Sequence, residues 1–155
     1  MKTYIGTKIL NAKPMTRGDY NTVRGWTLPD NENGADEGYL TDNGAGHLQW
    51  QPKDVFEDAF APFEALDFGM AIAALKLGMK VARAGWNGGG QFVYLVPANS
   101  YPAQTGIAKA YFGAEAMVPY RAYLALKTAQ GDVATWAPSC SDALAEDWQI
   151  IGEAA

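Results

Sequence analysis

Residues 80–97 read Lys80-Val81-Ala82-Arg83-Ala84-Gly85-Trp86-Asn87-Gly88-Gly89-Gly90-Gln91-Phe92-Val93-Tyr94-Leu95-Val96-Pro97. The first four residues indicate a strand, and a tight turn rich in glycine follows them. Residues 91–97 are apolar at both alternating sets of positions, a pattern typical of a strand that is covered on both faces. We therefore expect this stretch to form the centre of an antiparallel sheet.

The segments on either side predict one helix and more strands. Phe68, Ile72, Leu75 and Met79 follow helical spacing, with Asp67 as a plausible N-cap and Gly78 as a stop. Residues 120–127 alternate along a strand, and residues 133–136 and 147–151 suit two more. The predicted fold class is α+β, with an antiparallel sheet packed against one main helix.

The first 61 residues predict a separate small α/β extension. We expect a strand over residues 4–10, a helical turn after Thr16, a β-hairpin over residues 38–50 and a short helix from Pro52. The predicted domains are thus residues 1–61, a hairpin and helix unit, and residues 66–155, an α+β domain. Residues 98–118 form a long connection, which in compact domains is usually functional or interfacial.

The composition of the chain favours a globular protein. Of its 155 residues 48% are hydrophobic and 19% charged. No run approaches the roughly 18 apolar residues of a membrane span, and the N-terminus has no signal-peptide core, so we expect no membrane partner and a cytoplasmic location. One cysteine, Cys140, and one histidine, His47, make an internal disulfide impossible and disfavour a zinc site. We expect no metal and no cofactor.

The net charge restricts the class of ligand. The formal charge is −5, and Lys and Arg are scattered singly along the chain. An acidic protein repels the backbone of DNA and RNA, so we expect no nucleic acid polymer as a partner. A small ligand with one or two phosphates remains compatible, because a pocket needs only one or two basic side chains and backbone N–H groups.

Several phrases of the second domain together resemble one phage family. They are Phe68-Gly69, Ala74-Leu75-Lys76, Val81-Ala82-Arg83, Gly85-Trp86-Asn87-Gly88, Phe92-Val93-Tyr94-Leu95-Val96-Pro97, Leu124-Ala125-Leu126-Lys127, Trp136-Ala137-Pro138-Ser139 and Ser141-Asp142-Ala143-Leu144-Ala145-Glu146-Asp147-Trp148. In this order, over residues 66–151, they are similar to the domain whose members include the second type of Thoeris anti-defence protein.

The resemblance implies a function and an assembly. Members of this family form homotetramers and hold cyclic ADP-ribose isomers, such as glycocyclic ADP-ribose, in pockets between protomers without cleaving them. Some relatives also hold cyclic oligonucleotides. We therefore expect a homo-oligomeric sponge that sequesters an immune signal in the cytoplasm of the infected host cell. The resemblance gives no account of residues 1–61.

A ligand of this kind needs an apolar wall for adenine, donors for the pyrophosphate and acceptors for ribose hydroxyls. Trp86 and Trp148 provide aromatic faces, Arg83 and Arg121 donors, and Asp142 and Asp147 acceptors. The full predicted set of ligand-binding residues is Arg83, Trp86, Asn87, Gly88, Tyr94, Asn99, Arg121, Asp142, Asp147 and Trp148. Alternatively, Asp142 caps a turn, and Trp136 and Trp148 belong to the core or to an interface.

Catalysis is the weaker interpretation. The chain has no nucleophile elbow, no H-E-x-x-H and no Walker loop. Glu146 and Asp147 are adjacent, so in a strand they point to opposite faces, and the acidic run from Asp30 to Glu37 is not an EF-hand. We expect a protein that is not an enzyme. Two alternatives stay open, namely an enzyme that modifies a nucleotide and a structural or interaction protein without a small ligand.

Overall fold

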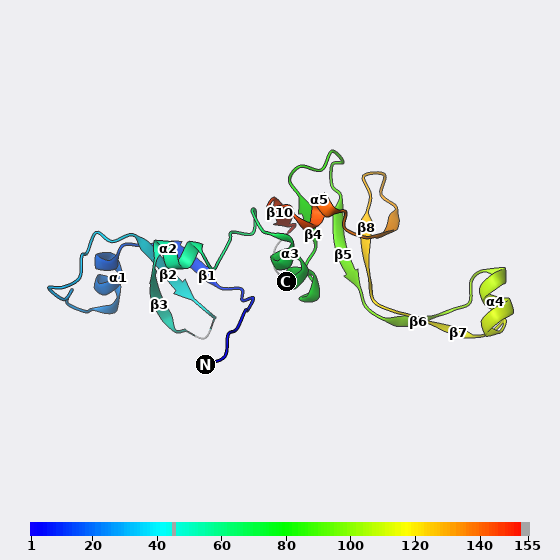
Figure 1. Cartoon of the computed structure of the whole chain (residues 1–155), viewed down its shortest axis with the longest axis horizontal. Coiled ribbons are helices and arrows are strands. Elements are labelled where there is room, and N and C mark those ends of the chain that lie inside the picture. The colour runs from blue at the N-terminus through cyan, green and yellow to red at the C-terminus, as the bar shows by residue number, and fades with distance from the viewer. Residues whose placement is uncertain (45, 153–155) are drawn as a thin grey trace. The chain divides into compact units, whose positions relative to one another are not determined.

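The structure is a computed structural model that describes residues 1–44 and 46–152. The chain folds as two units, Met1–Ala61 and Pro62–Ala155 (Figure 1). Each unit has its own antiparallel sheet. Within the described ranges, no helix combines the length and the apolar character needed to cross a bilayer.

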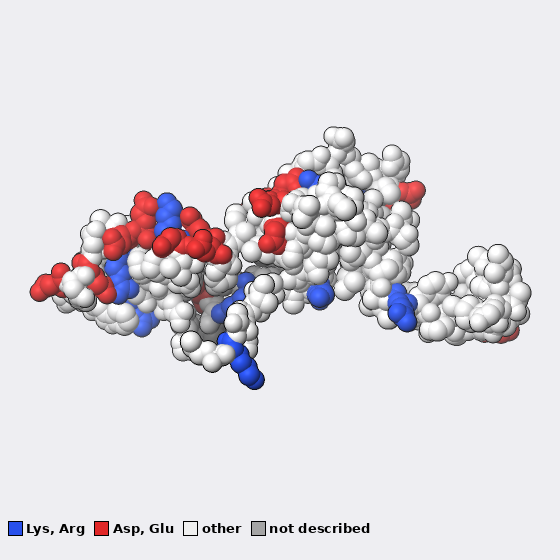
Figure 2. All heavy atoms as spheres, viewed as in Figure 1, with Lys and Arg blue, Asp and Glu red and all other residues white. Residues whose placement is uncertain are grey.

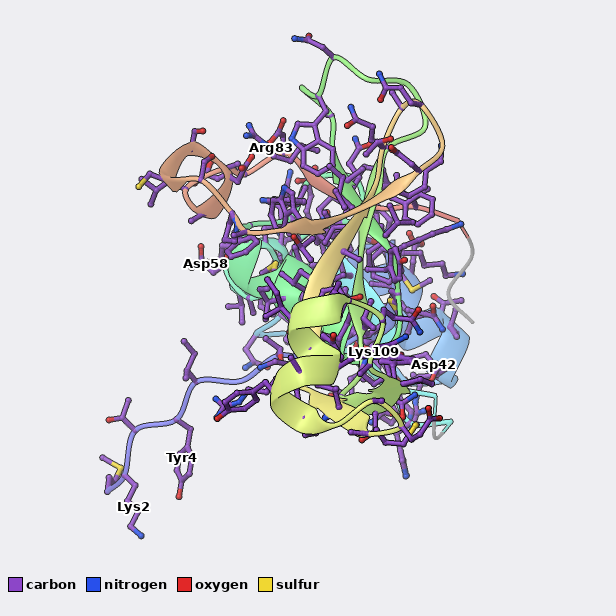
Figure 3. The ribbon with its side chains drawn as sticks, turned by 90° about the vertical axis from the view of Figure 1, so that its right-hand side faces the viewer. Lys2, Tyr4, Asp42, Asp58, Arg83 and Lys109 are labelled. Carbon is purple, nitrogen blue, oxygen red and sulfur yellow. The ribbon has the colours of Figure 1, made fainter. Side chains whose placement is uncertain are left out.

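The N-terminal unit is a three-stranded sheet with two helices. Its strand order is β1-β2-β3. The elements are β1 (Asn11–Pro14), α1 (Arg17–Arg24), β2 (Gly38–Asp42), β3 (Leu48–Pro52) and α2 (Lys53–Glu57). The expected strand over residues 4–10 is wrong, because this stretch has neither helix nor strand; Lys2 and Tyr4 lie on the extended N-terminal segment of the chain (Figure 3).

Local signals explain the elements of this unit. Thr16 accepts a hydrogen bond from the Asp19 amide and so caps α1, as expected. The helix ends at Gly25, whose φ of 69° lies in the left-handed region that favours glycine. Tyr39 of β2 stacks on Phe56 of α2 with ring centroids 4.1 Å apart, which fixes the short helix on the hairpin.

The C-terminal unit is built on a five-stranded antiparallel sheet. The strand order is β10-β4-β5-β8-β9, so the hairpin predicted from residues 80–97 lies at its centre. The strands are β4 (Val81–Arg83), β5 (Phe92–Val96), β8 (Tyr123–Lys127), β9 (Val133–Trp136) and β10 (Trp148–Ile150). The α+β class predicted from the sequence is confirmed.

One helix covers one face of this sheet. Helix α3 (Phe68–Lys76) begins at Asp67, whose carboxylate accepts a hydrogen bond from the Met70 amide at 2.7 Å. Beneath it lie Val81, Val93 and Trp148, which are fully buried. Because the paired strand residues Val81 and Val93 point to the same side, these three residues mark the covered face of the sheet.

The long connection between β5 and β8 is a folded arm. It consists of β6 (Asn99–Pro102), α4 (Gly106–Phe112) and β7 (Met117–Tyr120), and β6 and β7 pair with each other in a two-stranded sheet (Figure 1). Residues 121 and 122 separate β7 from β8, so the continuous strand expected over residues 120–127 is wrong. The alternation of side chains continues through residues 121 and 122 because both strands are extended. The sequence pattern therefore does not reveal the break.

The packing of α3 on the sheet predicts that alanine substitutions at two nearby leucines change the free energy of unfolding by very different amounts. Leu75 is 1% exposed under α3, whereas Leu77 is 65% exposed. We expect Leu75→Ala to lower the free energy of unfolding by about 2–5 kcal/mol, since it leaves a cavity. Leu77→Ala, the matched control, should change it by less than about 0.5 kcal/mol. Denaturant unfolding of the full chain measures both, and equal losses would contradict this packing.

Candidate functional site

Three tryptophans meet on the covered face of the C-terminal sheet. Trp86, Trp136 and Trp148 pack edge to face, with ring centroids 5.6–6.2 Å apart. Trp148 is fully buried, and its indole Nε1 donates a hydrogen bond to the Asp142 carbonyl at 2.9 Å. Trp86 and Trp136 are half-buried. Trp148 is therefore part of the core, and the other two present aromatic surface at its edge.

Arg83 joins three elements at this site through two carboxylates, and we call Arg83, Asp142 and Asp147 the Arg83 cluster. Its Nε donates to Asp147 Oδ1 at 2.7 Å, and its Nη1 donates to Asp142 Oδ1 at 3.0 Å. Asp147 Oδ2 also accepts from the Gly85 amide at 3.0 Å. The end of β4, the start of β10 and helix α5 (Cys140–Ala143) are thus fixed to one guanidinium. In Figure 3 the labelled Arg83 lies in this crowded region.

Asp142 also caps the short helix on which it lies. Ser139 Oγ accepts a hydrogen bond from the Asp142 amide, and Asp142 Oδ2 accepts one from the Ser139 amide at 3.0 Å. These two bonds form a capping box. The capping interpretation of Asp142 therefore describes its geometry, while its second oxygen holds Arg83.

Both carboxylates of the cluster are held ionised. Hydrogen bonding from Arg83 lowers the pKa of Asp147 below its usual value, and the Gly85 amide acts in the same direction. Burial works to raise the pKa of Asp142, but hydrogen bonds from Ser139, Arg83 and Trp86 outweigh it and lower that pKa. Neither group is suited to act as a general acid near neutral pH.

Residues 85–90, which we call the glycine loop, lead from this cluster to the start of β5. A Cβ on Gly88 would lie 1.7 Å from Gln91 Nε2, so a larger residue would displace that side chain. Gly90 has a φ of 69°, a backbone conformation that favours glycine. The Gly90 carbonyl accepts a hydrogen bond from Lys127 Nζ at 3.2 Å. Asn87 is exposed at the tip of the loop.

The predicted ligand-binding residues fall into two groups. Five of them cluster around one guanidinium and one indole, with Asn87 and Gly88 on the adjoining loop; the five are Arg83, Trp86, Asp142, Asp147 and Trp148. Tyr94 lies on the opposite face of the sheet, because its neighbour Val93 points to the covered face. Asn99 and Arg121 lie where the arm leaves the sheet.

Sequence reasoning missed two lysines beside an aromatic ring. Lys80 Nζ lies 5.0 Å from the centroid of Phe92, and Lys127 is the cross-strand partner of Phe92. Strand alternation would have placed Phe92 and Tyr94 on one face. The pairing register with Lys127 was not available from the sequence, because it depends on the arm between β5 and β8.

Two of the four acidic residues in the run from Asp30 to Glu37 form ion pairs. Glu32 accepts two hydrogen bonds from Arg17, and Glu37 accepts one from Lys53 at 2.8 Å. Figure 2 shows carboxylates gathered over this unit with lysines and arginines among them. Among the residues that the structure describes, no group of three or more His, Cys, Asp or Glu side chains is arranged to hold a metal ion.

Comparison with known proteins identifies the domain that carries the cluster. A family model of the Thoeris anti-defense 2-like domain matches residues 66–151. The chain belongs to the Thoeris anti-defense 2-like family. It is similar to Thoeris anti-defense 2 of Bacillus phage SP01, with 37% identity over 87 residues, which cover 56% of this chain and 94% of the phage protein.

The family match assigns the parts of the chain. The residues matched to the Thoeris anti-defense 2-like domain contain α3, the five-stranded sheet, the arm and the Arg83 cluster. The N-terminal unit, Met1–Ala61, lies outside the match. The family expected from the sequence is confirmed.

The Arg83 cluster predicts how the stability of this domain depends on pH. Carboxylates with a lowered pKa stabilise the fold above the ordinary Asp pKa of about 3.9, and this contribution is lost as the pH falls through their pKa in the folded protein. We expect Arg83→Met to lower the melting temperature by several degrees at pH 7. The difference from the wild type should shrink in more acidic solution.

Arg121→Met is the matched control, because Arg121 is exposed between β7 and β8. It should melt like the wild type. Differential scanning calorimetry between pH 3 and 8 measures both variants. A difference for Arg83→Met that is the same at every pH would contradict the ion-pair account.

Proposed function

We propose that this protein is a phage anti-defence protein that binds a cyclic ADP-ribose-type immune signal and sequesters it without cleaving it. The observation that carries the proposal is the family match over residues 66–151, together with the similarity to an anti-defence protein of a phage. Such a protein would act in the cytoplasm of the infected host cell. Cyclic oligonucleotides are a second class of ligand that the same surface could accept.

The geometry supports a binding role for the Trp86 loop. Trp86 is half-buried beside an exposed Asn87 and three glycines, so an adenine could stack on the indole while loop amides approach a phosphate. In this proposal Asp142 and Asp147 use lone pairs not taken by Arg83 to accept hydrogen bonds from ribose hydroxyls. Arg83 positions the two carboxylates, since its guanidinium already donates to both of them.

Sequestration fits the chemistry of the cluster better than turnover does. The pKa of each of its two carboxylates is lowered, and the one histidine of the chain, His47, lies exposed in the N-terminal unit. A hydrolase would need a general acid or an activated nucleophile beside the ligand. The alternative of a nucleotide-modifying enzyme therefore has no chemical support from these residues.

We further propose that copies of the chain associate, and that the arm is part of their contact. Six large apolar residues of the arm are 42–85% exposed; they are Tyr101, Ile107, Tyr111, Phe112, Met117 and Tyr120. At about 200 Å² per residue, the exposed parts amount to roughly 700 Å². This is close to the about 800 Å² that each partner contributes to a standard interface.

Charge and strand pairing also favour a second copy at the arm. Residues 99–120 contain only Lys109 and Glu115 as charged residues, and in Figure 2 the arm is almost white. Two chains of charge −5 repel each other least where each is neutral. A two-stranded ribbon is marginally stable by itself, so β6 and β7 gain from a partner. A pocket between copies could bring Tyr94, Asn99 and Arg121 of one chain to the Trp86 loop of another.

The first prediction from this proposal concerns affinity. Isothermal titration with glycocyclic ADP-ribose should give a Kd in the nanomolar range, about −12 kcal/mol, because a sponge must outcompete the effector. Trp86→Ala should weaken binding by about 1–3 kcal/mol through loss of stacking. Trp26→Ala, which removes an exposed indole in the N-terminal unit, is the control and should leave the Kd unchanged.

Absence of heat with every cyclic ADP-ribose isomer would contradict the proposed ligand and direct the search to cyclic oligonucleotides. A specific protein partner, with no nucleotide bound, would instead favour the interaction-protein interpretation.

The second prediction concerns assembly. We expect Ile107→Lys combined with Tyr111→Lys to shift the native mass from an oligomer towards the monomer, because these residues are 85% and 82% exposed on α4. Val55→Lys, at a 53% exposed position on α2 of the N-terminal unit, is the matched control and should keep the oligomer. A wild type that is monomeric by native mass spectrometry would contradict the proposed assembly.

A further inference from the structure

The start of the chain has the sequence of a strand but no strand beside it in a single copy. Residues 4–9 read Tyr4-Ile5-Gly6-Thr7-Lys8-Ile9 and are rich in β-branched and aromatic side chains. The chain continues from them into β1, whose first residue, Asn11, pairs with Asp42, the last residue of β2. Because β2 ends at that point, it offers no neighbour to residues 4–10. The strand signal in the sequence is therefore left without a partner.

The apolar side chains of this segment are exposed. Ile5 is fully exposed, Tyr4 is 85% exposed and Ile9 is 42% exposed. Figure 3 shows Tyr4 on the extended segment. In a strand, side chains alternate between the two faces, so Ile5, Thr7 and Ile9 would lie on one face. All three are branched at Cβ, and together they form a stripe that gains from packing against a neighbouring strand.

Strand β9 is an unprotected edge of the C-terminal sheet. It pairs with β8 on one side and is the last strand of the order on the other. Its residues Val133–Trp136 include no charge and no proline, and Val133 is 57% exposed. Among the described residues, no strand or backbone hydrogen bond reaches β9 from its outer side. Its outward N–H and C=O groups can therefore pair with another strand.

The other sheet edges have the protection that β9 lacks. The outer side of β10 is covered, because Trp148 forms a bridge with Leu66. The Ile150 amide also donates to the Phe63 carbonyl on that side. Each remaining edge strand contains a proline, which blunts an edge; these are Pro14 of β1, Pro52 of β3, Pro102 of β6 and Pro119 of β7. Of the described strands, β9 is therefore best suited to receive an added strand.

We infer that residues 5–9 of one copy add as a sixth strand to the β9 edge of a second copy. Thr7 then lies beside Thr135, and in either strand direction one isoleucine of the segment lies beside Val133. Val133 and Thr135 share one face of β9, so β-branched side chains meet on both strands. The contact is separate from the arm, and the inference does not depend on the ligand.

Charge and symmetry favour this partner. Residues 1–10 contain two lysines and no acidic residue, whereas residues 62–155 contain eight acidic and six basic residues. The segment of one copy is therefore attracted to the C-terminal unit of another. Each copy carries both the segment and the β9 edge, so two copies that exchange segments form a closed pair in which both edges are covered.

Disulfide capture tests the pairing and identifies the partner. In a Cys140→Ser background, which removes the exposed native thiol, full-length Thr7→Cys and Thr135→Cys chains are co-expressed, purified and mildly oxidised. Each copy has one cysteine, so a 7–135 disulfide, identified by peptide mass spectrometry, forms only between copies. We expect it about tenfold faster than with Ala129→Cys in place of Thr135→Cys, because a disulfide needs two neighbouring Cα atoms. Ala129 is exposed in the β8–β9 turn and is the matched control.

Amide hydrogen exchange of the oligomer provides a second test. We expect residues 5–9 to exchange about tenfold more slowly than an unpaired peptide, because a hydrogen-bonded amide exchanges only when the bond opens. Thr7→Pro should remove this protection and also that of the outward amides of β9, since proline blocks pairing in the middle of the segment. Lys2→Pro lies outside the paired residues and should retain both. Neither position belongs to a helix or strand, so both units should fold.

Three results would overturn the inference. The first is a 7–135 disulfide that forms only within a chain carrying both cysteines, which would show that the segment pairs with its own copy. The second is a 135–135 disulfide as the main product, which would show that two β9 edges pair with each other. The third is exchange of residues 5–9 at the rate of an unpaired peptide under conditions in which the protein is oligomeric.

Discussion

The guanidinium of Arg83 is the constraint on which the C-terminal unit depends. It lies at the end of β4 and holds Asp147 at 2.7 Å and Asp142 at 3.0 Å, so an edge strand and a short helix are tied to the sheet by one side chain. The Asp142 carbonyl then accepts a hydrogen bond from the buried indole of Trp148. Removal of the cation would leave two part-buried carboxylates without their counter-charge, which costs more than the pair itself contributes.

This constraint divides the sheet into two faces with different roles. The covered face carries α3, the tryptophan cluster and the Arg83 network, and its polar groups are used in holding the fold together. The opposite face carries the rings of Phe92 and Tyr94, and the arm carries exposed apolar side chains. Surfaces of this kind are where binding energy remains available. We therefore assign contact with other copies mainly to the arm, and recognition of the ligand to the Trp86 loop at the edge of the covered face.

Sequence alone predicted the parts of the fold that local patterns encode. The helix after Asp67, the hairpin around the glycine loop and the cap at Thr16 are set by residues close together in the chain. The network of Arg83 with Asp147 was not foreseen, because 64 residues separate the two partners and any of several acidic residues could have filled the position. The arm was expected only as a long connection between strands. The sequence of so short a two-stranded ribbon is hard to tell from that of an irregular loop. The positions of Lys80 and Lys127 on either side of Phe92 in the sheet were missed for the same reason, because they follow from strand pairing.

The measurement that tests the account most directly is recovery of the ligand. Glycocyclic ADP-ribose would be incubated with an excess of the purified full-length protein, freed from it by heat denaturation and analysed by liquid chromatography and mass spectrometry. The account predicts that none of the ligand is free before heating and that all of it returns with unchanged mass and retention time. A product of altered mass or linkage, or a ligand that was never bound, would contradict sequestration as the function of this protein.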